Sequence, residues 1–104
     1  MGFKEKVYQV VAGIPAGRVM SYSGVAEKAG SPGASRAVGT LMKRNPFPGS
    51  GPGKVPCHRV VRSDGSVGGF SGRGGPEGKR AMLEEEGVGF SKGTIRREFF
   101  VNSG

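Results

Sequence analysis

The amino-acid sequence predicts a mainly α-helical domain with a small β component, organised around a helix-turn-helix. Three observations support this prediction. Apolar residues recur at helical spacing over residues 3–14, two short helical segments flank a glycine-containing turn near residue 32, and a proline begins another helical segment at residue 76. At 104 residues, of which 35% are hydrophobic, the chain can bury one modest core. We therefore expect a single domain over residues 1–104.

The N-terminal segment carries the apolar stripe of an amphipathic helix. Its members are spaced at i, i+4, i+7, i+8 and i+11: Phe3, Val7, Val10, Val11 and Ile14. We expect this helix to end near Gly13, before a short extended piece at "RVMSY". A second helix is predicted over residues 24–29, with Ser23 as its N-cap. Gly30 and a tight turn at residues 31–33 would end it.

The third predicted helix covers residues 34–44 and ends before Asn45-Pro46. Its inner face is predicted to hold Ala34, Ala37, Val38 and Leu41, and its outer face Arg36, Thr40, Lys43 and Arg44. With the second helix it describes a helix-turn-helix whose second helix is basic on the outside. Small residues recur along it, at Gly33, Ala34, Ser35, Ala37 and Gly39, and would let its backbone approach a neighbouring helix or the floor of a DNA groove. Packing between helices alone does not explain the outward Arg36.

The second half of the chain begins with a Pro/Gly loop at residues 47–54. The stretch "VPCHRVV" that follows is predicted to be extended, because Pro56 biases the residue before it away from the helical region. Asp64-Gly65 is typical of a hairpin turn. A last helix is predicted over residues 76–86, with Gly87 as its C-terminal cap. The basic, aromatic tail after Phe90 is expected to add a strand.

Glu86 is unusual within that last helix. It lies four residues after Met82 and three after Leu83, so it shares their inward face, and it stands at the end of the helix that the macrodipole makes unfavourable for a carboxylate. An inward carboxylate in this place needs a partner. Glu84, by contrast, can pair with Arg80 at i+4.

The net charge of +8 is unevenly distributed. Residues 1–63 hold ten basic and two acidic residues, whereas residues 64–104 hold six of each. This asymmetry favours a polyanionic partner, most simply nucleic acid, although a basic surface that only keeps the protein in solution would look similar. No apolar run approaches the roughly 20 residues that span a bilayer, so we expect no membrane contact. The lone cysteine cannot form an internal disulfide, and we expect an intracellular location.

Cys57 is the only cysteine and stands directly before the only histidine, His58. One Cys and one His cannot supply the roughly four ligands of a zinc site, so we expect no metal. The pattern alone favours a buried cysteine that packs like a small hydrophobe. Against this, His58, Arg59 and Arg62 form surroundings that stabilise a thiolate, which is the nucleophilic form.

Five motifs decide between these interpretations. "VMSY", "SRAVGTLMKRNP", "VPCHRVV", "GSVGGFSG" and "LEEEG" occur in the order in which they occur in the O6-alkylguanine-DNA alkyltransferases, and over residues 3–90 the chain resembles the C-terminal, catalytic domain of that family. The resemblance implies a winged helix-turn-helix-like DNA-binding domain. It also implies a monomer that binds double-stranded DNA from the minor-groove side and flips the damaged nucleotide out. The alkyl group of O6-alkylguanine would pass to Cys57 once per molecule, without a cofactor, and O4-alkylthymine is a second candidate substrate.

The family's residue roles carry over to matching positions of this chain. Cys57 would be the nucleophile, His58 its base through a water, and Glu86 the group that orients His58. Tyr22 would assist rotation at the flipped phosphate or proton delivery, and Asn45 would brace the active-site turn. Arg36 would fill the space that the base vacates, and the remaining DNA contacts would come from Ser35, Ala37, Gly39, Thr40, Lys43 and Arg44. The substrate pocket would be formed by Pro56, Val60, Phe70 and Ser71.

The loop between Asn45 and Cys57 is longer than is usual in the family. The resemblance also includes alkyltransferase-like proteins, which bind alkylated DNA without repairing it and commonly carry tryptophan in place of the cysteine. Cys57 is present here and the chain has no tryptophan, which favours transfer over sensing. A plain helix-turn-helix regulator is the third alternative. The implied location is the cytoplasm, with the nucleoid, or the nucleus.

Overall fold

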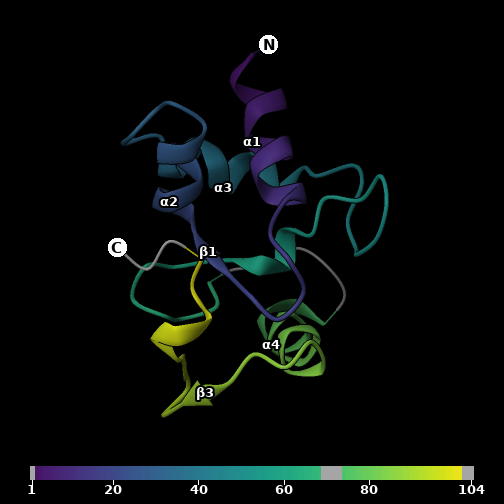
Figure 1. Ribbon diagram of the computed structural model, residues 1–104, viewed down its shortest axis with the longest axis vertical. Helices are drawn as coiled ribbons and strands as arrows, with labels where there is room; N and C mark the ends of the chain where they lie inside the picture. The colour runs from purple at the N-terminus through teal and green to yellow at the C-terminus, as the bar shows by residue number, and fades with distance from the viewer. Residues whose placement is uncertain (1, 69–73, 102–104) are drawn as a thin grey trace.

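The structure is a computed structural model, and it describes residues 2–68 and 74–101 (Figure 1). The four helices are α1 (Phe3–Ala12), α2 (Tyr22–Lys28), α3 (Ser35–Lys43) and α4 (Gly75–Glu85). The strands are β1 (Met20–Ser21), β2 (Val60–Val61), β3 (Phe90–Ser91) and β4 (Thr94–Ile95), and η1 (Cys57–Arg59) and η2 (Arg97–Phe99) are single 3-10 turns. Helices α1 to α3 lie together at one end of the molecule, and α4 and β3 lie at the other (Figure 1). This confirms the prediction of a mainly α-helical domain with a small β component.

Helices α2 and α3 form the predicted helix-turn-helix. The turn between them places Gly30 at φ +87° and Gly33 at φ +91°, a backbone region that side chains other than glycine rarely adopt. The predicted N-cap of α2 was wrong by two residues. The hydroxyl of Ser21, not of Ser23, accepts a hydrogen bond from the backbone N–H of Gly24 at 2.9 Å, and α2 therefore begins at Tyr22.

The buried face of α3 differs from the prediction at two positions, Ala37 and Met42. Val38 and Met42 are buried, whereas Ala37 is exposed beside Arg36. Met42 stands at i+4 from Val38, so the two side chains lie on the same face of the helix, and Ala37 lies outside that face. The outward position of Arg36 is as predicted. Ala37 consequently belongs to the outer, basic face of the helix.

Strand β1 connects the two ends of the molecule. It pairs in parallel with β2, with Met20 opposite Val60 and Ser21 opposite Val61. Just before β1, Val19 forms a parallel bridge with Phe100. The tail adds the β3–β4 hairpin, which confirms the expected strand there. Within the described residues, no helix has the length and apolar character needed to cross a membrane.

The prediction of a fully extended "VPCHRVV" was wrong in its middle. Only Val60–Val61 is a strand, and residues 57–59 form the turn η1. Pro56 has φ −77° and ψ +75°, and the N–H of Cys57 donates to the carbonyl of Val55 at 2.8 Å, which is an inverse γ-turn. The chain therefore bends sharply at Pro56, and Cys57 stands at the first position after the bend.

Two other turns are close to their predictions. Asp64-Gly65 does form a turn, in which the Asp64 carboxylate accepts from the backbone N–H of Ser66 at 2.9 Å, but β2 pairs with β1 and not across this turn. Helix α4 ends one residue earlier than predicted. Gly87, at φ +94°, follows it as predicted, and the N–H groups of Gly87 and Val88 bond to the carbonyls of Glu84 and Leu83. This is a Schellman motif.

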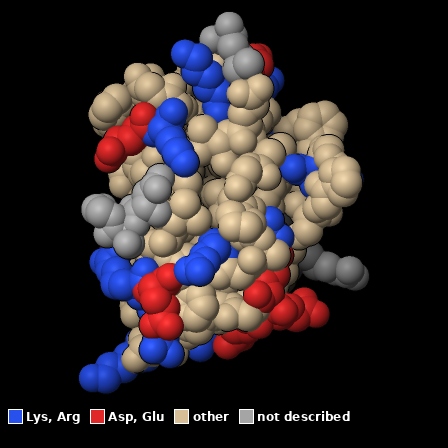
Figure 2. Space-filling view, in the orientation of Figure 1, with Lys and Arg blue, Asp and Glu red and all other residues tan. Residues whose placement is uncertain are grey.

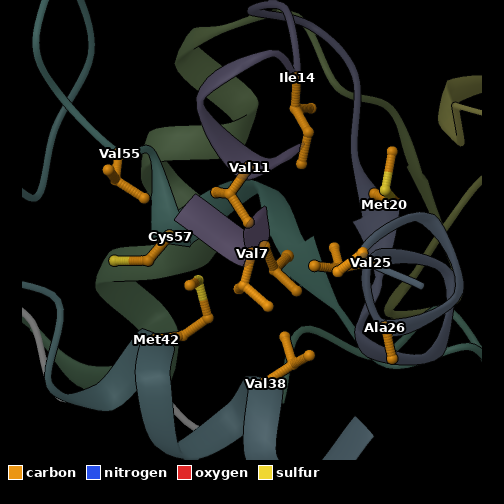
Figure 3. Packing of buried hydrophobic residues seen from close by; sticks show 12 residues of the cluster. Val7, Val11, Ile14, Met20, Val25, Ala26, Val38, Met42, Val55 and Cys57 are labelled. Carbon is orange, nitrogen blue, oxygen red and sulfur yellow. The ribbon is translucent and has the colours of Figure 1, made fainter. Parts of the chain in front are cut away.

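The main core cluster joins α1 to the helix-turn-helix and to the segment around Cys57 (Figure 3). Its fully buried members include Val7 and Val11 from α1, Val25 from α2 and Val38 from α3. A second cluster, around Val61 and Leu83, packs α4 against the sheet and the tail. The turn η1 lies where the two clusters meet, so packing on both sides fixes its backbone.

Candidate active site and nucleic-acid interface

Cys57 lies at the edge of the main core cluster and is 7% exposed. Its side chain points away from Val7 and Val11, so the sulfur is at the margin of the cluster (Figure 3). One interpretation of the sequence was that Cys57 packs like a small hydrophobe. This holds for the carbon atoms of Cys57, which belong to the core cluster. The sulfur therefore lies on the side of Cys57 that faces away from Val7 and Val11.

His58 is 1% exposed, and its Nε2 lies 3.0 Å from Oε2 of Glu86. The other ring nitrogen, Nδ1, is buried and has no hydrogen-bond partner within the part of the chain that the structure describes. Burial lowers the pKa of His58, and the charges of Arg59 and Lys79 lower it further, while the hydrogen bond and charge of Glu86 oppose this. A lowered pKa keeps the ring neutral near pH 7. A neutral ring can accept a proton.

Glu86 has the partners that its inward position required. Arg59 donates from Nε to Oε1 at 2.9 Å and from Nη2 to Oε2 at 2.5 Å. Partial burial alone would raise the pKa of Glu86, but the hydrogen bonds from Arg59 and His58, together with their charges, lower it to about 2. Glu86 is therefore ionised at neutral pH, and one carboxylate holds both side chains that follow Cys57.

Arg59 also connects this carboxylate to two other segments. Its Nη1 donates to the carbonyl of Ile14 at 2.8 Å, and its Nη2 donates to the hydroxyl of Ser50 at 3.0 Å. Ser50, in the long loop, donates in turn to Glu86 at 3.2 Å. The guanidinium of Arg59 is thus committed to Glu86, Ile14 and Ser50. The sequence-based expectation that Arg59 supports a thiolate at Cys57 is replaced by this role in holding Glu86.

Asn45 braces the approach to Cys57, in the place where the resemblance put it. Its Nδ2 donates to the carbonyl of Val55 at 2.7 Å, and its Oδ1 accepts from the backbone N–H of Phe47 at 2.9 Å. The N–H of Val55 donates back to the carbonyl of Phe47 at 2.6 Å. These three bonds join the two ends of the loop immediately before the bend at Pro56.

Tyr22 is the first residue of α2 and lies against α4. Nζ of Lys79 donates to its hydroxyl at 3.3 Å and lies 5.5 Å from the centre of its ring. Burial raises the pKa of Tyr22, the charge of Cys57 acts in the same direction, and Arg62 opposes them. The phenol is therefore protonated at neutral pH and can donate a hydrogen bond.

The outer face of α3 carries the predicted basic residues. Arg36, Ala37, Thr40, Lys43 and Arg44 are exposed, while Ser35 and Gly39 are half-buried. An open hollow beside this face is lined by Tyr22, Ser35, Arg36, Gly39 and Arg62. Acidic residues on the face shown in Figure 2 gather mainly over the end that holds α4 and the hairpin. The hollow joins the basic helix to the tyrosine that approaches Lys79.

A family model described as "6-O-methylguanine DNA methyltransferase, DNA binding domain" matches residues 2–88, which is most of the chain. The chain belongs to this family. Its curated members include methylated-DNA–protein-cysteine methyltransferases from Methanothermobacter thermautotrophicus, 44% identical over 86 residues, and from Rattus norvegicus, 40% identical over 85 residues. The chain spans less than half of each: the matches cover 83% and 82% of this chain but 44% and 38% of those proteins.

Two family structures bound to DNA resemble this fold. The Mycobacterium tuberculosis protein OGT in complex with DNA has a TM-score of 0.73 and 39% identity, over 84% of this chain and 49% of that one. Atl1 of S. pombe, in complex with damaged DNA containing O6-carboxymethylguanine, has a TM-score of 0.74 and 34% identity. That match covers 96% of this chain and 94% of Atl1. These likenesses support the helix-turn-helix class of the fold.

The structure brings several of the predicted site residues into contact with one another or with neighbouring segments. His58, which follows Cys57, bonds to Glu86, and Asn45 bonds to the carbonyl of Val55, two residues before Cys57. Of the predicted pocket residues, Pro56 and Val60 are both buried. The predicted pocket residues Phe70 and Ser71 lie outside the described residues.

Sequence reasoning missed two residues of this candidate site, Arg59 as a partner of Glu86 and Lys79 as a fully buried cation. The signal for Lys79 was available. It stands four residues before Leu83 and seven before Glu86, so the periodicity that turned Glu86 inward turns Lys79 inward as well.

Proposed function

We propose that this chain repairs DNA by transferring the alkyl group of O6-alkylguanine to the sulfur of its own Cys57. The observation that carries the proposal is the Cys57–His58–Glu86 arrangement, in which His58 bonds to Glu86 through Nε2 and has Nδ1 unpartnered among the described residues. This is the order of nucleophile, base and orienting group that activates a thiol. The description of the matching family model, which names a 6-O-methylguanine DNA methyltransferase, supports the same reaction.

The reaction balances without any other reagent. The thiol proton of Cys57 passes through a bridging water to Nδ1 of His58, and the ionised Glu86 stabilises the imidazolium that forms. The thiolate sulfur then attacks the alkyl carbon. A sulfur–carbon bond forms, the carbon–O6 bond breaks, and its electron pair stays on the guanine, which takes up one proton, while His58 gives up the proton that it took from Cys57, so that no proton is gained or lost overall. The product is a thioether with no easy reverse reaction, so each molecule acts once.

Access to the base requires DNA bound at the α3 face. The alkyl group is unreachable inside the base stack, and the nucleotide must rotate out of the helix. Arg36 is exposed on α3 and lines the same hollow as Tyr22, so it is placed to occupy the vacated position while the nucleotide passes Tyr22. Ala37 is exposed and Gly39 is partly exposed on this face, and their small side chains would let the backbone of α3 approach the floor of the minor groove. Lys43 and Arg44 would contact phosphates.

The second candidate function is a sensor that binds alkylated DNA without transfer. It is favoured by one observation, the structural match to Atl1 in complex with damaged DNA, at a TM-score of 0.74. The presence of a cysteine at position 57 argues against a sensor. Since both functions need the same DNA surface, only the fate of the alkyl group distinguishes them.

The test is incubation with duplex DNA carrying O6-methylguanine, followed by mass spectrometry of the peptide that contains Cys57. We expect one added methyl group per molecule. Tight lesion-selective binding with no added methyl would establish the sensor, and binding without lesion preference would leave only a regulator. The Cys57→Ala variant should bind the same DNA and transfer nothing, and surviving transfer in that variant would refute the mechanism.

A further inference from the structure

Ser50, in the middle of the long loop before Cys57, is bonded to two side chains of the candidate site. Its hydroxyl donates to Oε2 of Glu86 at 3.2 Å and accepts from Nη2 of Arg59 at 3.0 Å. The same Nη2 also donates to Oε2 of Glu86, so the three groups close a ring of hydrogen bonds. Ser50 is exposed, and water can satisfy the hydroxyl of an exposed serine. Its place in this ring therefore calls for a role.

The backbone on both sides of Ser50 has a conformation that glycine adopts most readily. Gly49 has φ +117° and Gly51 has φ +107°. A Cβ at either position would meet no atom within 4 Å, so it is the backbone conformation, and not a lack of space, that favours glycine there. The N–H of Lys54 donates to the carbonyl of Gly51 at 3.1 Å and closes the turn that follows. The sequence Gly-Ser-Gly therefore shapes the loop so that Ser50 faces Glu86.

The two carboxylate oxygens of Glu86 are loaded unequally. Among the described residues, Oε1 accepts only from Nε of Arg59, at 2.9 Å. Oε2 accepts from Nη2 of Arg59 at 2.5 Å, from Nε2 of His58 at 3.0 Å, and from the Ser50 hydroxyl. A carboxylate oxygen offers about two lone-pair sites, so Ser50 and His58 share one acceptor. The carboxylate is satisfied without Ser50, and the serine hydroxyl stabilises negative charge that would otherwise act on the imidazole.

We propose that Ser50 is a positioning residue, through which the loop fixes Oε2 of Glu86 and limits how strongly this carboxylate holds a second proton on His58. The charged groups that act on His58 are Glu86 at the end of α4, Lys79 within α4, and Arg59 of η1. Burial, Arg59 and Lys79 lower the pKa of His58, and Glu86 raises it. A contact that weakens the action of Glu86 therefore keeps the imidazole neutral. The consequence for alkyl transfer rests on the proposed function, whereas the protonation of His58 concerns the free protein.

The first experiment titrates His58 by NMR, without DNA. His58 is the only histidine, so its imidazole signals need no further assignment. Between about pH 4 and pH 7 Glu86 stays ionised and Lys79 stays charged, because their pKa values are about 2 and about 8. Ser50→Ala should move the midpoint of the His58 titration to higher pH, because the freed Oε2 then attracts the imidazolium more strongly.

Three further variants separate the hydroxyl from the rest of the loop. Ser50→Thr keeps a hydroxyl and should retain the wild-type midpoint. Gly51→Ala keeps Ser50 but strains the turn, and should shift the midpoint in the same direction as Ser50→Ala. Ser91→Ala, at an exposed serine of β3, is the matched control and should change nothing. An unchanged or lower midpoint in Ser50→Ala, a threonine that behaves like alanine, or an equal shift in Ser91→Ala would overturn the proposal.

The second experiment measures the second-order rate constant of methyl transfer against pH in the wild type and in Ser50→Ala. The imidazole of His58 must be neutral to accept the thiol proton, so the acid limb of this profile reports the protonation of His58 in the free protein. The limb should move to higher pH by the same interval as the NMR midpoint. A shifted titration with an unshifted limb would refute the effect on transfer. Should the wild type transfer no methyl group, the proposed function fails, while the titration still decides whether Ser50 acts on His58.

Discussion

Replacing Lys79 with methionine should make the protein more stable. A lysine pKa that falls from 10.5 to about 8 on folding corresponds to roughly 3 kcal/mol of unfavourable free energy in the protonated state. The substitution also removes the hydrogen bond to Tyr22, worth about 1 kcal/mol. Methionine fills a similar volume with an apolar chain. We therefore expect the free energy of unfolding at pH 7 to rise by up to about 2 kcal/mol.

The pH dependence of this gain identifies its cause. Below pH 8 both the folded and the unfolded wild type carry the proton on Lys79, and the cost of the buried charge is fully present. Between pH 8 and 10.5 the unfolded chain binds more protons than the folded one, so wild-type stability gains from Lys79 as the pH rises. The difference between variant and wild type, measured by urea unfolding at several pH values, should shrink across this window. The buried ammonium of Lys79 would not be destabilising if the variant were less stable than the wild type, or if their difference in free energy of unfolding did not change with pH.

Three other predictions concern the rest of the site. Asn45→Ala removes two hydrogen bonds at the loop ends and should lower the free energy of unfolding, measured with urea, by about 2 kcal/mol. An unchanged urea midpoint would contradict this prediction. Glu86→Gln leaves Arg59 without its carboxylate, so it should destabilise the protein at pH 7. The pKa of Glu86 is about 2 against an ordinary 4.5, so its stabilising contribution is lost as the pH falls through that range, and the variant and wild type should converge near pH 2 in acid-unfolding experiments. Arg36→Ala should weaken lesion-selective binding with little change in the salt dependence, whereas Lys43→Ala should lower the slope of log K against log salt by about 0.9. Identical behaviour of these two variants would contradict the separate roles.

The sequence was sufficient for the helices and for the contact between His58 and Glu86. Helical periodicity placed Glu86 on an inward face before any partner was known, and the structure supplies that partner in Arg59. Periodicity failed where neighbouring small residues made two faces equally acceptable. Alanine fits a buried or an exposed position, so nothing local decided Ala37, and the larger Val38 and Met42 determined which face α3 buries.

The direction of Arg59 could not be predicted from the local pattern. Arg59 stands two residues after Cys57, and the sequence predicts that it supports the thiolate. A 3-10 turn, however, separates successive side chains by about 120°, and η1 directs Arg59 toward Glu86. The turn itself depends on the γ-turn at Pro56 and on packing from both core clusters. The preference of the residue before proline for an extended conformation does not predict either of them.

The long loop before Cys57 need not loosen the thiol, because its ends are joined independently of its length. Asn45 bonds to both Phe47 and Val55, so residues 48–54 leave and return at nearly the same point. Loop-closure entropy grows only with the logarithm of length, and doubling a loop costs about 0.6 kcal/mol. Ser50 then ties the middle of the loop to Arg59 and Glu86. The added residues therefore act on the carboxylate that orients His58, and Ser50→Ala should alter transfer through His58 while the position of Cys57 stays unchanged.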